Sequence, residues 1–143
     1  MSRPRLKPSW PRKIQLRQEA EQLRPQLEEA RLELRALYRA LDRMLLAQDM
    51  PVQLRRLQEL DADLAEALYV LDRRPGGMDW SAMIGDTRAS LARLPAARAA
   101  VLATFDDSTR AELEERARLT RDVLAPRDAY LEIPGRDPDA RSW

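Results

Sequence analysis

Hydrophobic residues in the first third of the chain recur at alternating steps of four and three residues. This 3.5-residue spacing, held for about four heptads, predicts an α-helix that buries a narrow apolar stripe against another helix, as in a coiled coil. Pro25 lies off this stripe, where it either kinks the helix or starts a second helix at its first turn. The first apolar stripe consists of Leu16, Ala20, Leu23, Leu27, Ala30, Leu34, Leu37, Leu41 and Met44.

A second apolar stripe follows after a short connection. Residues 48–51, Gln-Asp-Met-Pro, predict a tight turn that places Pro51 in the first turn of the next helix. Residues 75–77, Pro-Gly-Gly, predict its end. Two striped helices joined by so short a connection predict an antiparallel hairpin over residues 14–74. The apolar face of the second helix is formed by Leu54, Leu57, Leu60, Leu64, Leu68 and Leu71.

The charges predict the same pairing of helices. Folding the chain about residue 50 places opposite charges face to face, and we expect them to set the register more than the stability. Asp61, on or next to the second stripe, is expected to pair with Arg39. The facing sets are Arg35, Arg39 and Arg43 against Glu59, Asp61, Asp63 and Glu66, and Glu28 and Glu29 against Arg73 and Arg74.

The first predicted helix is longer than its partner, at about 54 Å against roughly 33 Å. Residues before about Gln26 therefore lack a partner within the hairpin, and either the C-terminal helices or another chain must cover their apolar stripe. We favour another chain, because Glu19 and Arg24 occupy flanking positions suited to ion pairs across a parallel dimer. The expected interface residues are Leu16, Ala20, Leu23 and Leu27.

The C-terminal half predicts three shorter helices over residues 79–125. Asp79 is expected to cap the first of them, and Pro95 to open a short alanine-rich second helix. Asp106 and Asp107 belong to a cluster of capping residues, and a Thr-x-x-Glu capping box begins at Thr109. We expect Pro126 to end the third helix.

Basic residues are concentrated in residues 1–13, which hold five cations and no acid, whereas the remainder carries a net charge of −4. Three prolines are expected to keep this arm out of regular structure. One hypothesis is that the arm binds nucleic acid through phosphates and a stacked indole. The other, which we favour, is that it contacts an acidic protein or serves only as an unstructured solubilising tail. The candidate contacts are Arg3, Arg5, Lys7, Trp10, Arg12 and Lys13.

The expected fold is therefore all-α: a long antiparallel helical hairpin with a coiled-coil-like seam, plus a smaller three-helix C-terminal unit. Both parts form one helical domain over residues 14–125, between the basic arm and an extended tail over residues 126–143. The tail contains an apolar cluster that is expected to dock on this protein or on a partner. The cluster consists of Tyr130, Leu131 and Ile133.

The composition narrows the chemistry that the chain can perform. With no His and no Cys, the chain has no disulfide, no thiolate nucleophile, no usual zinc site and no histidine general base. Glu112 and Glu115 have the spacing of metal ligands, and Asp63 with Glu66 comes near it, but we interpret all four as solvated helix faces. We therefore predict no catalytic residue, no cofactor and no metal. No apolar run approaches the roughly 20 residues of a membrane span, so a soluble cytoplasmic protein is expected.

No family motif stands out in the sequence. We expect a non-enzymatic helical adaptor or scaffold subunit that self-associates or docks within a larger protein complex. The alternative is a nucleic-acid-binding accessory subunit that uses the basic arm.

Overall fold

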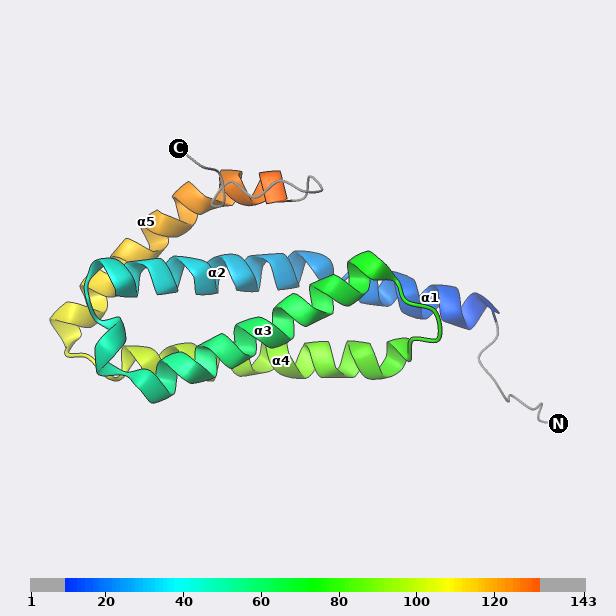
Figure 1. Ribbon diagram of the computed structural model, residues 1–143, viewed down its shortest axis with the longest axis horizontal. Helices are drawn as coiled ribbons and strands as arrows, with labels where there is room; N and C mark the ends of the chain where they lie inside the picture. The colour runs from blue at the N-terminus through cyan, green and yellow to red at the C-terminus, as the bar shows by residue number, and fades with distance from the viewer. Residues whose placement is uncertain (1–9, 132–143) are drawn as a thin grey trace.

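The structure, a computed structural model, describes the backbone of residues 10–131 and the side chains of residues 12–125. Over this range the chain is all-helical and contains no strand (Figure 1). The first two helices follow one another as a long bent rod, and the last helix crosses the second one on its outer side. The elements are α1 (Trp10–Glu21), α2 (Arg24–Arg43), the 3₁₀-helix η1 (Ala47–Asp49), α3 (Pro51–Arg73), α4 (Trp80–Leu102) and α5 (Asp107–Leu131).

Pro25 lies in the first turn of α2, which confirms one of the two outcomes predicted for it. The ring lacks an N–H, so one hydrogen bond of a continuous helix is missing here. The chain nevertheless passes from α1 to α2 in a helical conformation, because Leu23 retains helical dihedral angles (φ −81°, ψ −15°). Its N–H donates to the carbonyl of Ala20 at 3.0 Å. As a result, α1 and α2 form one bent rod with an uninterrupted apolar side.

The first apolar stripe forms the centre of the hydrophobic core, as predicted. Its members from Ala20 to Leu41 are at most 4% exposed, whereas Leu16 and Met44 at its ends are half-buried and pack against the same core. The second stripe lies opposite on α3, where Leu57 and Leu64 are fully buried. The two stripes therefore predicted the core of this half of the chain.

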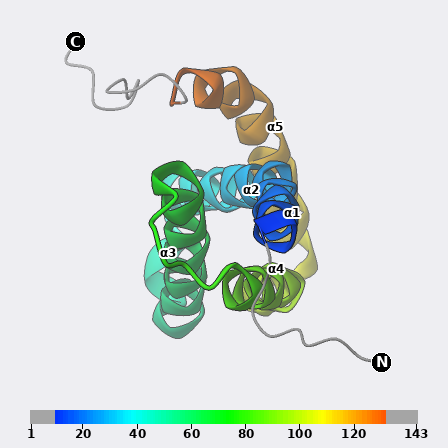
Figure 2. The ribbon, with the colours of Figure 1, turned by 90° about the vertical axis from the view of Figure 1, so that its right-hand side faces the viewer.

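The predicted hairpin is present, but it does not dominate the packing. Helices α2 and α3 are antiparallel and touch, yet α2 packs most extensively against α5, and α3 against α4. An end view shows α1, α2, α3 and α4 around the core, with α5 leaving on the outer side of α2 (Figure 2). Each helix of the hairpin thus packs against a second helix, α5 for α2 and α4 for α3, which the two apolar stripes did not predict.

Ion pairs between α2 and α3 fix their register. Arg31 Nε lies 3.0 Å from Asp61 Oδ1, and Arg24 Nη1 lies 2.9 Å from Asp72 Oδ1. Asp61 therefore holds a position across the α2–α3 interface, as expected. The predicted partner was wrong, since Arg31 lies about two turns before Arg39 on α2.

Two other predicted pairs of the hairpin form with the C-terminal helices instead. Asp63 was expected to face α2 but binds Arg93 of α4, with Oδ2 and Nη2 2.9 Å apart. Glu29 was expected to face the end of α3 but pairs with Arg121 of α5. Both differences have one cause: α4 and α5 occupy the sides of α3 and α2 that a two-helix arrangement leaves open.

The C-terminal half forms two long helices, so the prediction of a three-helix unit was wrong. Pro95 lies inside α4, and α5 runs through Pro126 to Leu131 instead of ending before it. Pro95 is exposed, so the hydrogen bond lost at its ring lies on the side that water reaches. Buried residues on both sides, Leu94 and Val101, hold the two halves of α4 against the same core.

The cap of α4 was predicted correctly, and at α5 the predicted capping cluster supplies the cap but not the capping box. Asp79 Oδ1 accepts a hydrogen bond from the Ala82 N–H at 3.0 Å, which makes Asp79 the N-cap. At α5 the cap is Asp106, whose Oδ1 accepts from the Thr109 N–H at 2.8 Å. Hydrogen bonds from Thr109 also hold the pKa of Asp106 below its ordinary value. The predicted capping box is absent, since the Glu112 side chain binds Arg116.

Helix α4 covers the part of α1 that extends beyond the hairpin. Ala20, Leu23 and Leu27, expected at an interface with another chain, are at most 4% exposed within this single chain. Glu19 pairs with Arg88 of α4 at 3.1 Å. The residues that join α4 to α1, Arg88 and Trp80, lie before Pro95, and the same helix also packs along α3. The stripe is therefore closed by the C-terminal half, the alternative that the sequence analysis did not favour.

Replacing Leu27 with Ala tests whether the stripe is an intrachain core. Leu27 is 0% exposed, so Leu27→Ala is expected to lower the free energy of unfolding by about 2–5 kcal/mol in denaturant titrations. The control Ile14→Ala, at a side chain 45% exposed, is expected to change it by less than about 0.5 kcal/mol. Equal effects of the two substitutions would contradict the burial described above.

A second prediction concerns the Tyr38 hydroxyl, which is buried without a hydrogen-bond partner among the described residues. Burial raises the pKa of Tyr38, and the nearby Asp61 carboxylate adds to this effect. Since an unsatisfied buried hydroxyl is costly, Tyr38→Phe is expected to raise the free energy of unfolding by up to about 1 kcal/mol. A loss of stability in the same titration would show that the hydroxyl has a partner in solution.

Candidate docking groove

Part of the predicted basic arm is helical. Helix α1 begins at Trp10, so residues 10–13 do not belong to an irregular arm. Proline is tolerated in the first turn of a helix, and Pro11 occupies such a position. Arg12 and Lys13 are exposed on α1. The remaining arm residues, Arg3, Arg5 and Lys7, lie outside the described residues.

The predicted C-terminal cluster is divided in a similar way. Tyr130 and Leu131 lie in the last turn of α5, so residues 126–131 are helical and not an extended tail. Their side chains and Ile133 lie outside the described part of the chain.

Three of the four carboxylates that were considered as metal ligands, Glu112, Glu115 and Asp63, pair with arginines, whereas Glu66 has no ion pair with the described residues. Glu112 binds Arg116 at 3.1 Å, and Glu115 binds Arg118 at 2.6 Å on the same exposed face of α5. The hydrogen bond from Arg118 lowers the pKa of Glu115. Within the side chains that the structure describes, no group of three or more His, Cys, Asp or Glu residues is arranged to hold a metal ion.

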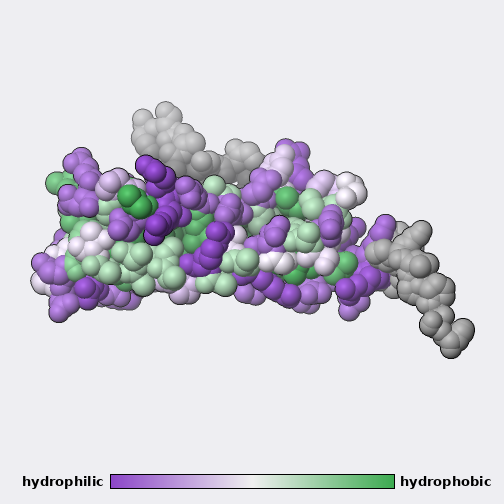
Figure 3. Space-filling view, turned by 90° about the horizontal axis from the view of Figure 1, so that it is seen from below, coloured by the Kyte–Doolittle hydropathy of each residue, from purple (hydrophilic) through white to green (hydrophobic). Residues whose placement is uncertain are grey.

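A candidate site is a groove of about 730 Å³ between α3 and α4. Its floor is largely apolar, with the buried Thr87 and Ser90 among its lining residues, and carboxylates stand along its rim. In Figure 3, which views the side of the molecule on which α4 lies, apolar and hydrophilic residues adjoin along the surface. The floor is formed by Ala67, Val70, Met78, Ala82, Met83 and Ala89. The rim carries Asp63, Glu66, Asp79 and Asp86.

Small side chains account for the space between the two helices. Ala67 on α3 and Ala82 and Ala89 on α4 do not reach across the gap that larger residues would fill. Val70 and Met78 are only half-buried, so part of the apolar floor is in contact with water. The groove is therefore an open apolar surface and not a sealed cavity.

The groove carries uncompensated negative charge. Asp63 is neutralised by Arg93, which also donates to Ser90 Oγ and closes one end of the groove. Glu66 and Asp86 are exposed and form no ion pair with the described residues. A ligand that brings positive charge would therefore meet two carboxylates that are not paired with a cation among the described side chains.

The interface between α2, α4 and α5 shows the opposite arrangement. There Arg98 lies between two carboxylates, 3.6 Å from Glu33 and 3.8 Å from Glu114. Arg121 similarly pairs with Glu29. The acidic residues at that interface form ion pairs that join helices of the chain, whereas Glu66 and Asp86 on the rim of the α3–α4 groove do not.

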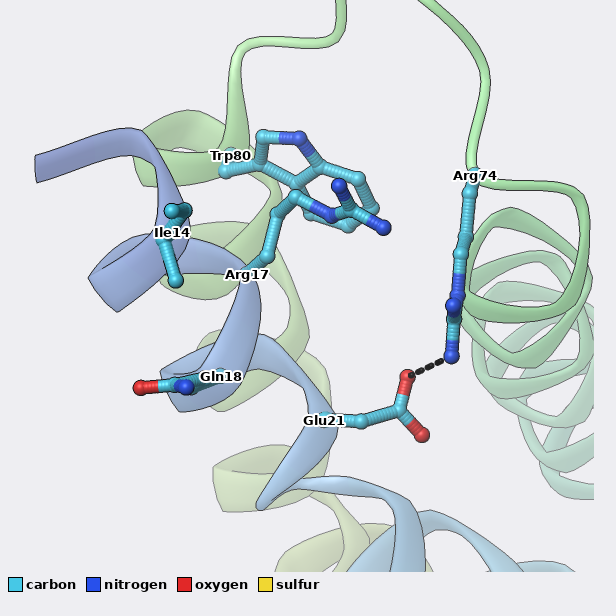
Figure 4. A pocket seen from close by; sticks show the side chains of 6 residues that line it. All are labelled: Ile14, Arg17, Gln18, Glu21, Arg74 and Trp80. Carbon is cyan, nitrogen blue, oxygen red and sulfur yellow. Dashed lines mark ion pairs between the residues drawn. The ribbon is translucent and has the colours of Figure 1, made fainter. Parts of the chain in front are cut away.

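A smaller cavity of about 400 Å³ lies where α1 meets the first turn of α4. Figure 4 shows Ile14 and Arg17 of α1 next to Trp80, the first residue of α4. On its other side, the ion pair of Glu21 with Arg74, 3.9 Å long, joins α1 to the end of α3. These contacts hold the beginning of α1 beside the beginning of α4.

The sequence analysis did not identify the groove, because its lining comes from two helices whose pairing was not predicted. One signal was present in the sequence. Ala82 and Ala89, like Asp79 and Asp86, are seven residues apart, which places each pair on one face of a helix. The pairing of α3 with α4 was needed to show that this face borders an apolar floor.

Comparisons of the chain with models of protein families, with curated proteins and with solved structures find no match. In the part of the chain that the structure describes, no helix combines the length and apolar character needed to cross a membrane.

Proposed function

We propose that this chain is a non-enzymatic helical adaptor or scaffold subunit that binds a basic segment of a protein partner in the α3–α4 groove. The observation that carries the proposal is the combination of a partly exposed apolar surface with rim carboxylates, Glu66 and Asp86, that have no ion pair within residues 12–125. Apolar side chains of the partner would contact the floor, and its cations would face the rim.

The arrangement corresponds to a known mode of peptide recognition, in which an amphipathic segment lays its apolar side into a groove between elements. Burial of apolar area supplies most of the affinity in such a complex. Charges on the rim increase the association rate and select the sign of the partner more than they add affinity. Acidic and neutral segments are therefore expected to bind less well than basic ones.

Self-association remains part of the proposal, but it requires a surface other than the first apolar stripe. That stripe is filled by the C-terminal half, as described above. On α5, Leu119 is 50% and Val123 is 65% exposed, four residues apart on one face. A second copy would use exposed apolar residues of this kind.

The alternative proposal is nucleic-acid binding by the basic N-terminal residues. The exposed Lys13 and Arg17 favour it, because they extend the positive charge of residues 1–9 onto α1. Binding of this kind would be dominated by phosphate contacts and would weaken steeply as salt is added.

Fluorescence anisotropy with a labelled amphipathic peptide of Leu and Lys tests the proposed function. A peptide with Glu in place of each Lys is the ligand control. The double variant Glu66→Gln/Asp86→Asn is expected to weaken binding of the basic peptide about fivefold, as two exposed ion pairs of about 0.5 kcal/mol would require.

The matched control variant is Asp49→Asn/Glu59→Gln, which changes the net charge equally at exposed positions outside the groove. It is expected to bind the basic peptide as the native protein does. Equal weakening by both double variants, or equal binding of the acidic peptide, would contradict the proposal.

A further inference from the structure

We infer that the α3–α4 groove is also a regulatory site, in which the chain's own residues 1–9 bind intramolecularly. This inference deepens the proposed function, because the segment would occupy the groove that the partner needs. It rests on three observations: the chemistry of the segment, the place where the segment joins the fold, and the length of the groove.

The sequence of residues 1–9, Met-Ser-Arg-Pro-Arg-Leu-Lys-Pro-Ser, matches the groove in pattern. A residue that precedes proline is restricted to extended backbone conformations, and this applies to two residues of the segment. In an extended backbone, successive side chains point to opposite sides. One side would then carry the cations, and the other would be apolar. The cationic side comprises Arg3, Arg5 and Lys7, and the apolar side Pro4, Leu6 and Pro8.

The segment joins the fold at the end of the molecule where α4 also begins (Figure 1). It precedes Trp10, the first residue of α1. One turn further along α1, Ile14 borders the small cavity that Trp80 lines (Figure 4). Asp79, immediately before Trp80, lines the α3–α4 groove. The two cavities thus adjoin at the start of α4, and residues 1–9 leave the fold near this point.

The segment is long enough for the groove. Along α4 the groove lining extends from Asp79 to Arg93, which is about 21 Å at 1.5 Å per residue. Nine residues in an extended conformation span up to about 30 Å. The extended length of the segment therefore exceeds the length of the groove lining along α4.

Because residues 1–9 are covalently joined to α1, weak contacts with the groove are sufficient for the segment to bind there. Exposed ion pairs are individually weak, but a short flexible linker gives an effective concentration in the millimolar range. Docking of the segment lowers the apparent affinity of any partner in proportion to the occupied fraction. A partner with more positive charge or a larger apolar side would displace the segment, and a charge-neutralising modification of the segment would open the groove.

Paramagnetic relaxation measured on the full-length protein tests the inference directly. Because the chain has no cysteine, Ser2→Cys provides a single attachment point for a nitroxide. We expect the amide signals of Ala82, Asp86 and Ala89 to lose intensity with the oxidised label and to regain it on reduction. The signals of Leu119 and Val123 on α5 serve as the reference and are expected to change little.

The groove variant Glu66→Gln/Asp86→Asn, combined with Ser2→Cys, is expected to abolish the broadening at α4. The control Asp49→Asn/Glu59→Gln is expected to retain it. Absence of broadening at α4 in the native protein, or its persistence in the groove variant, would overturn the inference. A further control mixes nitroxide-labelled protein with isotope-labelled protein that carries no nitroxide. If the broadening arises only between these two copies, docking is intermolecular and the inference is overturned.

The peptide assay separates this inference from the proposed function. In Arg3→Gln/Arg5→Gln/Lys7→Gln, intramolecular docking predicts tighter binding of the Leu/Lys peptide than in the native protein. Unchanged peptide affinity in this variant would overturn the inference and leave the proposed function standing. Broadening at α4 without any peptide binding, in either protein, would overturn the proposed function alone.

Discussion

The structure depends on one constraint: the apolar stripe along the bent rod of α1 and α2 must be covered over its whole length. Pro25 lies off the stripe, so the missing hydrogen bond bends the rod without interrupting the apolar side. Helix α3 is too short to cover all of this side. The C-terminal half supplies the remainder: α4 lies on α1, and Leu113 and Ala117 of α5 join the same core. Further along α5, Leu124 packs against Leu32 and Ala36, which lie off the stripe.

This constraint explains the course of α4 and the position of the groove. To reach from the end of α3 to the far end of the bundle, α4 has to continue past Pro95, and buried side chains on both sides of the proline keep it in place. The same helix carries alanines on the side toward α3, at Ala82 and Ala89. Helix α4 thus covers the rod closely, while its alanines leave the space between α3 and α4 partly unfilled. The open floor of the groove and the exposed carboxylates on its rim result from this unfilled space.

Local patterns predicted what is determined locally. The two stripes identified most of the core residues of α1, α2 and α3, and the Asp79 cap was also predicted from the sequence. They did not include Leu32 and Ala36 of α2, which are buried against Leu124 of α5. What failed depends on contacts between distant segments. Pro95 signals a helix boundary unless burial on both sides outweighs it, and the partner of Asp61 follows from the packing of three helices. The groove was missed for the same reason, since neither α3 nor α4 contains it alone.

The central claim is that the core of this chain is complete within a single copy. Equilibrium unfolding by denaturant, followed by circular dichroism at protein concentrations that differ by two orders of magnitude, tests it most directly. If α4 and α5 cover the stripe as described, the midpoint is independent of protein concentration. A midpoint that rises with concentration would show that folding requires another copy, and the stripe would then belong to an interface between chains.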